Sequence, residues 1–122
     1  MTELNFATLF QHEADLLAIP AGLPLFKEGD DLNETMYVLV SGTAEILVHG
    51  KVVETAKSGA ILGEMAMIDK GVRSATVMAK SDCRLVVIGR RRFDFLVQQT
   101  PNFALSVMRV IADRLRRVDS GL

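Results

Sequence analysis

The chain has 122 residues, of which 49% are hydrophobic and 24% are charged, and its formal net charge at pH 7 is −1. This length fits one domain with a single core, and the balanced charge gives no overall basic field that would attract nucleic acid or an anionic membrane. No apolar run is long enough to span a bilayer, the polar N-terminus lacks a signal-peptide core, and the single cysteine, Cys83, rules out an internal disulfide, so we expect a cytoplasmic protein with no membrane segment in this chain.

The first predicted element is a short helix within residues 3–17, whose apolar side consists of Phe6, Leu9, Phe10 and Leu16. A stretch rich in proline and glycine at residues 20–24 then interrupts regular structure. Leu25 and Phe26 begin a short strand that ends in a turn at Gly29 and Asp30.

Short β-branched runs separated by glycine turns follow from Met36 onward. They cover residues 37–40, 43–48 and 51–55, with turns at Gly42 and Gly50. Residues 74–79 and 84–88 are predicted to form two more strands. Regularly spaced short strands of this kind indicate antiparallel hairpins within a sandwich or jelly roll.

The segment from Gly59 to Ala79 has the parts of an anion pocket. Its glycines allow the backbone to approach a ligand closely, and the turn after Gly63 can present unpaired amides. Arg73 follows Glu64 by nine residues and begins a strand-like run whose alternation places the guanidinium on the apolar face. A permanent charge on that face needs a partner, because burying it alone would cost more than a small domain can supply.

The residues alone leave the nature of that partner open. It can be a bound anion, or it can be an internal salt bridge, for which Glu64 is the natural acid. Glu64 also fits a simpler role as a first-turn acid favoured by a helix dipole. Ser74 and Ala75 have equally plain alternatives, as an outward polar residue and as core packing.

Two helices are predicted at the C-terminus, at residues 91–99 and at about 101–118, with Thr100 and Pro101 fitting a helix start. Along the second helix, apolar residues repeat at spacings of four, three, four and three to form a coiled-coil-like seam: Ala104, Met108, Ile111, Leu115 and Val118. A second apolar row lies beside this seam and consists of Phe103, Val107 and Val110. A helix this apolar needs cover beyond the β-sheets, either a second copy of the chain or a ligand pocket that it roofs. The arginines near its end, including Arg114, complement the helix dipole.

The motif Gly63-Glu64-Met65-Ala66, followed by Arg73-Ser74-Ala75-Thr76, resembles the phosphate-binding cassette of cyclic nucleotide-binding domains. Catabolite activator proteins, regulatory subunits of protein kinase A and cyclic nucleotide-gated channels share that cassette. The spacing from glycine to arginine matches the kinase-type cassette without a gap, whereas Val72 stands where many members have proline.

This resemblance implies a fold that is mainly β with flanking helices. The β part is an antiparallel, jelly-roll-like β-roll of about eight strands, with a short N-terminal helix and two C-terminal helices. It implies one domain over residues 1–122, with the helical segment at 3–17, the β-roll at 18–89, the cassette at 61–76 and the C-terminal helices at 90–122.

The resemblance also implies the ligand-binding residues, which are Gly63, Glu64, Met65, Ala66, Arg73, Ser74 and Ala75. Arg73 is expected to pair with the exocyclic oxygens of a cyclic phosphate, and Glu64 to accept a hydrogen bond from the ribose 2′-hydroxyl. Gly63 and Ala66 would offer backbone amides to the phosphate. Ser74 would add a hydroxyl to the phosphate or the base, and Ala75 would line the pocket. Contacts to the base would fall near Val118 and Asp119.

We therefore predict a non-catalytic sensor that reversibly binds a cyclic nucleotide, cAMP more than cGMP, and relays binding through its C-terminal helix. That helix also offers a homodimer contact. The alternative is a ligand-independent protein-interaction module of the same fold. The downstream effector stays open, as does whether the chain is free-standing or part of a channel, kinase or transcription regulator.

Enzymatic and nucleic-acid-binding classes find little support in the residues. A metal-dependent cupin needs converging histidines, and this chain has only His12 and His49, which lie outside any ligand-spaced cluster. No serine or cysteine has a plausible histidine and acid pairing for nucleophilic catalysis. The basic run at residues 90–92 lacks aromatic interleaving and any DNA-binding motif, so it is interpreted as a solvated cluster. We expect no catalytic residues, no metal, no cofactor other than the ligand, and no nucleic-acid contact.

Overall fold

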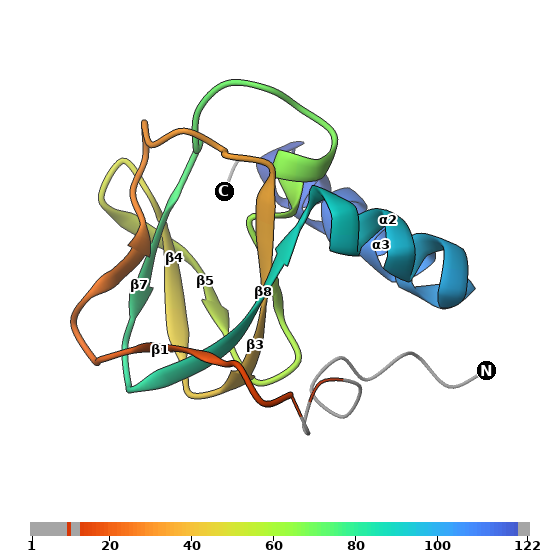
Figure 1. Cartoon of the computed structure of the whole chain (residues 1–122). Helices are drawn as coiled ribbons and strands as arrows, with labels where there is room; N and C mark the ends of the chain where they lie inside the picture. The colour runs from red at the N-terminus through yellow and green to blue at the C-terminus, as the bar shows by residue number, and fades with distance from the viewer. Residues whose placement is uncertain (1–9, 11–12, 120–122) are drawn as a thin grey trace.

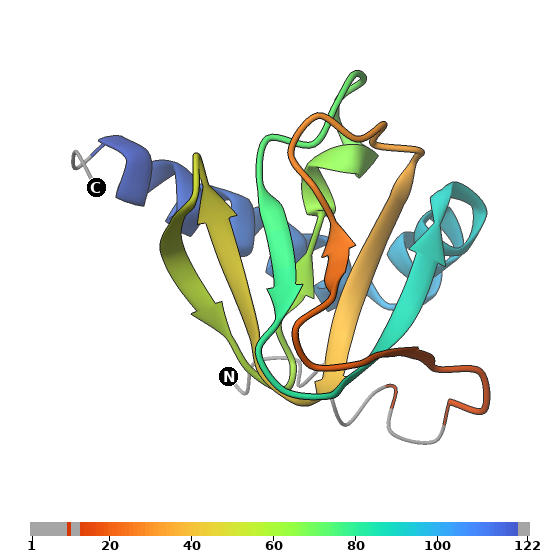
Figure 2. The ribbon, with the colours of Figure 1, turned by 90° about the vertical axis from the view of Figure 1, so that its left-hand side faces the viewer.

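The structure is a computed structural model that describes residue 10 and residues 13–119, with side chains described as far as residue 117. Its elements are β1 (Leu17–Ile19), β2 (Pro24–Phe26), β3 (Thr35–Ser41), β4 (Ala44–Val48), β5 (Lys51–Ala56), β6 (Ile61–Leu62), the 3₁₀ helix η1 (Glu64–Met67), β7 (Thr76–Ala79), β8 (Cys83–Gly89), α2 (Arg90–Gln99) and α3 (Pro101–Asp119). The strands form two four-stranded antiparallel sheets, in the orders β1-β8-β3-β6 and β2-β7-β4-β5. Figures 1 and 2 show the sheets around one interior, with the helices to one side. The predicted β-roll with two C-terminal helices is confirmed.

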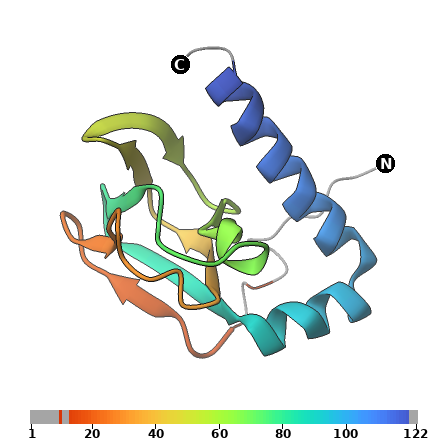
Figure 3. The same ribbon diagram turned by 90° about the horizontal axis from the view of Figure 1, so that it is seen from above.

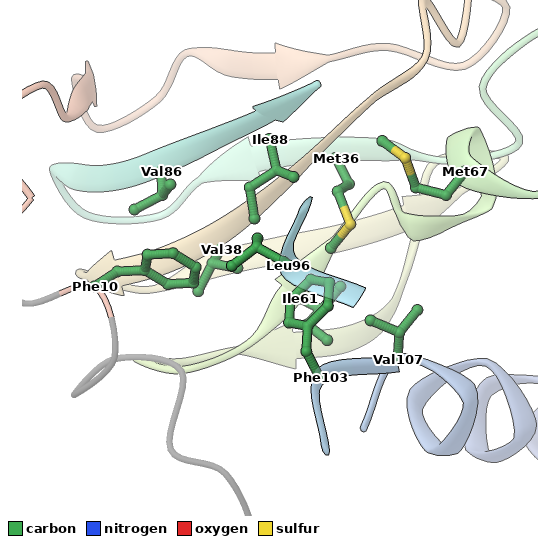
Figure 4. Close-up of a cluster of buried hydrophobic side chains, with 10 residues drawn as sticks. All are labelled: Phe10, Met36, Val38, Ile61, Met67, Val86, Ile88, Leu96, Phe103 and Val107. Atoms are coloured by element: carbon green, nitrogen blue, oxygen red, sulfur yellow. The ribbon is translucent and has the colours of Figure 1, made fainter. Parts of the chain in front are cut away.

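Alternation along the strands divides the core into two clusters. On β3, Met36 and Val38 contact the helices, whereas Leu39, on the opposite face, packs inside the roll. The outer cluster lies between one sheet and the helices and contains Phe10, Met36, Val38, Ile61, Met67, Val86, Ile88, Leu96, Phe103 and Val107 (Figure 4). The inner cluster joins the two sheets and contains Leu39, Ala44, Ala56, Leu62, Val77, Ala79, Cys83 and Leu85. The cassette therefore lies where the roll interior and the helix layer meet.

The two C-terminal helices form a V against the outer cluster, as Figure 3 shows. Phe103 is fully buried and meets the Phe93 ring edge-on, with the ring centroids 5.7 Å apart. Val107 continues the same buried row, so the second apolar row of the sequence pattern is the one that packs on the β-roll. The seam is divided: Met108 is 60% exposed and Leu115 57% exposed, whereas Ala104 is half-buried and Ile111 packs against the outer cluster.

The predicted N-terminal helix is not confirmed. Residues 3–9 and 11–12 lie outside the described part of the chain, and residues 13–16 are not helical. Leu17, which the prediction placed in that helix, begins β1 and pairs with Leu85. An edge strand takes its backbone partners from β8, and this pairing overrides the weak local helical pattern.

Within the residues that the structure describes, no helix combines the length and the apolar character needed to cross a membrane.

Candidate functional site

Gly63 is the turning point of the cassette. It has a left-handed backbone conformation, with φ of 71° and ψ of 25°, and directly precedes η1. A Cβ atom at this position would lie 2.7 Å from Nη1 of Arg73. Glycine is therefore needed here twice, for the backbone angle and for the space that the guanidinium occupies.

The backbone of Arg73 is fixed by the turn at Gly29 and Asp30. The Gly29 N–H donates to the Arg73 carbonyl at 2.9 Å, and the Arg73 N–H donates to the Asp30 carbonyl at 2.7 Å. Arg73 is 5% exposed and Ser74 is exposed, as strand alternation predicted, although β7 itself begins only at Thr76. The turn at Gly29 and Asp30, which the sequence analysis predicted, thus positions the candidate ligand-binding arginine.

The Arg73 guanidinium contacts an aromatic ring and two backbone carbonyls. It lies over the Phe26 ring at 4.1 Å from the centroid. Its Nη2 donates to the Thr35 carbonyl at 2.8 Å, and its Nη1 donates to the Gly63 carbonyl at 3.3 Å. No ion pair of Arg73 occurs among the described residues, and its buried Nε has no hydrogen-bond partner there. The Arg73 guanidinium is therefore a buried positive charge with one N–H donor, at Nε, available to a ligand.

The electrostatics of Arg73 agree with this geometry. Burial lowers the pKa of Arg73, and the weaker influences of Tyr37 and of the carboxylates of Asp30 and Glu64 oppose that shift from a distance. Burial of a charge without a direct counter-ion costs free energy, and an anion in contact with it would recover that cost.

Backbone strain lies next to the same group. Asn33 and Glu34 have positive φ values of 55° and 46°, and Thr35, whose carbonyl accepts from Arg73, follows them directly. Two consecutive left-handed residues other than glycine are uncommon, and such strain collects at functional sites.

Glu64, the predicted partner of the ribose, is bound by α3. It is 5% exposed, and its Oε1 accepts a hydrogen bond from Nη1 of Arg114. Its other oxygen, Oε2, accepts no hydrogen bond within the described part of the chain. Glu64 forms no ion pair with Arg73, so the internal salt bridge that the sequence left open is not the arrangement of this structure.

Arg114 is the site residue that the sequence analysis missed. Its Nε and Nη2 donate to the two oxygens of Glu54 at 3.1 and 3.0 Å, and Nη2 also donates to the Ile61 carbonyl at 2.8 Å. Arg117 adds a further hydrogen bond to Glu54 at 2.7 Å. The helix-dipole role assigned to Arg114 is therefore incomplete, and no local pattern could have shown its partners, which lie 50 and 60 residues away in sequence.

The pKa values of this cluster move together. Burial acts against the charged form of Arg114, but its contacts with Glu54 and Glu64 raise its pKa above the ordinary value. Burial likewise works against the Glu54 carboxylate, yet the hydrogen bonds and charges of Arg114 and Arg117 lower its pKa below the ordinary value. Both groups are therefore ionised and mutually stabilised at neutral pH.

The structure places the remaining predicted residues around this arrangement without adding side-chain contacts. Met65 is half-buried in η1, and the N–H of the fully buried Ala66 donates to the Gly63 carbonyl at 3.2 Å. Ser74 is exposed and Ala75 is half-buried. The side chains of residues 118 and 119, expected near the base, lie outside the described residues.

The described residues contain no group of three or more metal-ligating side chains. The site offers a buried arginine, a carboxylate with one oxygen hydrogen-bonded to Arg114, and a glycine turn. These groups can hold a small anion that also carries a hydroxyl.

Comparison with known proteins identifies a family that matches this chain. The profile of the family described as "Cyclic nucleotide-binding domain" matches residues 16–100. A "Cyclic AMP receptor protein" of Thermus thermophilus is 31% identical over 108 residues, which cover 84% of this chain and 50% of that protein. A "cAMP-dependent protein kinase regulatory subunit" of Emericella nidulans is 36% identical over 90 residues, which cover 72% of this chain and 22% of that protein.

Among solved structures, the catabolite activator protein of Thermus thermophilus superimposes with a TM-score of 0.76 at 27% identity, over 93% of this chain and 60% of that chain. This chain spans half or less of the length of the two relatives named above, which are regulatory proteins. The match nevertheless extends over most of the chain and includes the cassette with Gly63, Glu64 and Arg73. The chain belongs to the cyclic nucleotide-binding domain family.

Proposed function

We propose that residues 1–122 act as one sensor domain that reversibly binds a cyclic nucleotide at the cassette. The observation that carries this proposal is the buried Arg73 guanidinium, whose Nε has no hydrogen-bond partner and which forms no ion pair among the residues that the structure describes. A cyclic phosphodiester brings one negative charge and two exocyclic oxygens, which suit the fork of donors on a guanidinium.

The other predicted residues take supporting roles in this proposal. Oε2 of Glu64, which accepts no hydrogen bond from the described residues, accepts one from the ribose 2′-hydroxyl. The backbone at Gly63, Met65 and Ala66 forms the turn around the phosphate. The exposed Ser74 hydroxyl reaches the phosphate or the base, and the small side chain of Ala75 leaves room for the ligand.

cAMP is proposed as the preferred ligand over cGMP. Serine at position 74 is frequent in bacterial cAMP-binding relatives, and guanine-selective relatives often have threonine there. The relatives reported above are themselves named for cyclic AMP. The domain has no chemistry of its own in this proposal, and its single, buried Cys83 suits a reducing cytoplasm.

The relay is proposed to run through α3. A ligand that engages Glu64 acts on the carboxylate that Arg114 of α3 already binds, so a shift of the cassette and a shift of α3 are mechanically linked. The ligand can move this equilibrium only by binding one arrangement of α3 more tightly than the other. We also propose that the exposed part of the α3 seam forms a weak homodimer contact, because Met108 and Leu115 expose apolar surface at coiled-coil spacing.

Thermal unfolding with cAMP, cGMP and 5′-AMP tests the ligand. At about a hundred times its dissociation constant, a cyclic nucleotide should stabilise the protein by roughly 2.7 kcal/mol. Arg73→Met should abolish this stabilisation and should leave the unfolding free energy without ligand within about 1 kcal/mol of wild type, because it removes both a buried charge and its contacts.

The matched control is Arg91→Met, which changes an exposed arginine of α2 and should leave the ligand effect intact. Absence of stabilisation by either cyclic nucleotide would favour the ligand-independent interaction module. Unchanged stabilisation of the Arg73→Met variant would show that this arginine is not the phosphate ligand.

A further inference from the structure

Glu54 lies on β5, the edge strand of its sheet, and precedes the cassette by seven residues. The register between β4 and β5 shifts beside it, since Ile46 pairs with Glu54 whereas Leu47 pairs with Val52. Such a bulge bends a strand and re-aims its side chains. The Glu54 side chain is 19% exposed and directed at α3, where it binds Arg114 and Arg117.

The two contacts between Glu54 and Arg114 fix the plane of a guanidinium. Nε and Nη2 donate to separate carboxylate oxygens, which is the bidentate fork arrangement. The Ile61 carbonyl accepts a further hydrogen bond from Nη2. With Nε and Nη2 engaged, the remaining nitrogen, Nη1, has one direction left, and it points at Oε1 of Glu64.

The orientation of the Arg114 guanidinium determines which carboxylate oxygen of Glu64 can accept a further hydrogen bond. Arg114 occupies Oε1, and Oε2 is left without a hydrogen bond among the described residues. Glu64 is only 5% exposed. Its carboxylate therefore has little freedom to adopt another rotamer once Arg114 binds Oε1.

We propose that Glu54 is a positioning residue for the ligand: through the plane of Arg114 it orients Glu64 so that one carboxylate oxygen accepts the ribose 2′-hydroxyl. This inference rests on the proposed function and adds to it a specificity for ribose that originates on a strand outside the cassette. Glu54 touches no ligand atom in this arrangement. Its influence is therefore confined to ligands that carry a 2′-hydroxyl.

A purely structural role of Glu54 predicts a different change in ligand affinity. If Glu54 only holds α3 against β5, its removal changes the affinity for every ligand of the site by the same factor. The 2′-deoxy form of the same cyclic nucleotide separates the two roles, because it keeps the phosphate and the base and lacks only the hydroxyl.

The experiment measures dissociation constants by calorimetry for cAMP and 2′-deoxy-cAMP, with cGMP and 2′-deoxy-cGMP as a second pair. Wild type should prefer the ribose form about tenfold, the value of one hydrogen bond to a charged group. Glu54→Gln should weaken binding of the ribose form about tenfold, leave binding of the 2′-deoxy form within about twofold, and so remove the preference.

Glu45→Gln is the matched control. It makes the same chemical change on the neighbouring strand β4, at a half-buried glutamate that forms no ion pair within the described residues, and it should keep the wild-type preference. Should Glu54→Gln fold poorly, Arg114→Lys provides a second route. It keeps the charge, loses the planar fork and should likewise remove the preference.

Equal weakening of the ribose and 2′-deoxy forms, or a preference that survives in both variants, would overturn the positioning role while leaving the sensor function in place. Failure of wild type to bind any of the four nucleotides would instead overturn the proposed function itself, and this inference with it.

Discussion

The Arg73 guanidinium occupies the space that a side chain at position 63 would need. The glycine lacks the Cβ atom that would lie 2.7 Å from Nη1 of Arg73, and its φ of 71° is a backbone angle that residues with a side chain rarely adopt. The guanidinium takes the vacated volume and donates to the Gly63 carbonyl from within it. The glycine and the arginine of the cassette motif are thus one packing unit, although nine residues separate them.

Replacement of Gly63 by alanine tests this unit. Gly63→Ala should lower the unfolding free energy by about 1–2 kcal/mol through the left-handed backbone. It should also displace the Arg73 guanidinium and weaken cyclic nucleotide binding at least about tenfold. Denaturant unfolding and calorimetric titration measure the two effects.

Gly50→Ala supplies the comparison. Gly50 has a φ of 80°, close to that of Gly63, but a Cβ there would meet nothing within 4 Å. This variant should lose similar stability and bind ligand normally. Equal affinities of the two variants would contradict the packing argument.

At the level of single residues, the sequence predicted what depends on alternation and missed what depends on distant contacts. Arg73 is buried and Ser74 is exposed, as the alternation predicted, although both precede the first residue of β7. The carbonyl of Thr35 and the ring of Phe26, which complete the guanidinium site, reach it from 38 and 47 residues away by sequence numbering. No short-range pattern encodes such meetings.

The helix α3 is attached to the β-roll in two chemically different ways. Near its start, Phe103 and Val107 bury apolar surface in the outer cluster. Near its end, Arg114 and Arg117 bind the carboxylates of Glu54 and Glu64. The first attachment is independent of pH in the acid range, and the second depends on ionised carboxylates.

Acid should therefore loosen α3. The pKa of Glu54 is lowered in the folded chain, so the unfolded chain binds the proton more readily, and the stabilisation exists above the ordinary carboxyl pKa of about 4.3. It is lost as the pH falls further, through the folded value. Between pH 6 and pH 3, wild type should lose about 1 kcal/mol more unfolding free energy than Glu54→Gln, which lacks this contribution.

Denaturant unfolding at several pH values measures this difference. The pKa of Glu13 is also lowered, first through its hydrogen bond to Arg92 of α2, so both proteins retain that part of the acid dependence. Parallel pH profiles for wild type and Glu54→Gln would show that Glu54 does not anchor α3.

The helices themselves were accessible from sequence, since the predicted ranges 91–99 and 101–118 differ by single residues from α2 and α3. Which face of α3 packs was not fixed by the periodicity. There were two apolar rows to choose from: Phe103 and Val107 of one row are buried, whereas Met108 and Leu115 of the more regular seam are exposed. Shape complementarity with the outer cluster decided between them, and a one-dimensional pattern does not contain it.

At the scale of the whole molecule, the glycine turns in the sequence predict the hairpins, but they do not predict the order of strands that are far apart in the chain. The adjacent pair β4 and β5 was predictable because a two-residue turn at His49 and Gly50 joins them. The pairing of β3 with β8 joins distant parts of the chain, and only the family resemblance implied both as parts of a β-roll, whereas β1 was not predicted as a strand.

The exposed part of the α3 seam gives the molecule a surface that suits a second copy. Ala104 and Ile111 are half-buried, and Met108 and Leu115 are more than half exposed, so apolar surface remains at coiled-coil spacing after the β-roll is covered. The described seam, from Ala104 to Leu115, is shorter than two heptads, which is marginal for a helix pair in water. We therefore expect a weak dimer, with a mass that rises between the monomer and dimer values as concentration increases.

Sedimentation analysis over a range of concentrations measures that mass. Leu115→Glu places a charge in the seam and should give a monomer at every concentration, because pairing would bury the charge without a partner. Phe95→Glu removes an equally exposed apolar side chain from α2, 60% exposed against 57% for Leu115, and should leave the association unchanged. A wild-type protein that stays monomeric throughout, or an equal effect of the two substitutions, would assign the seam to covering the ligand rather than to pairing chains.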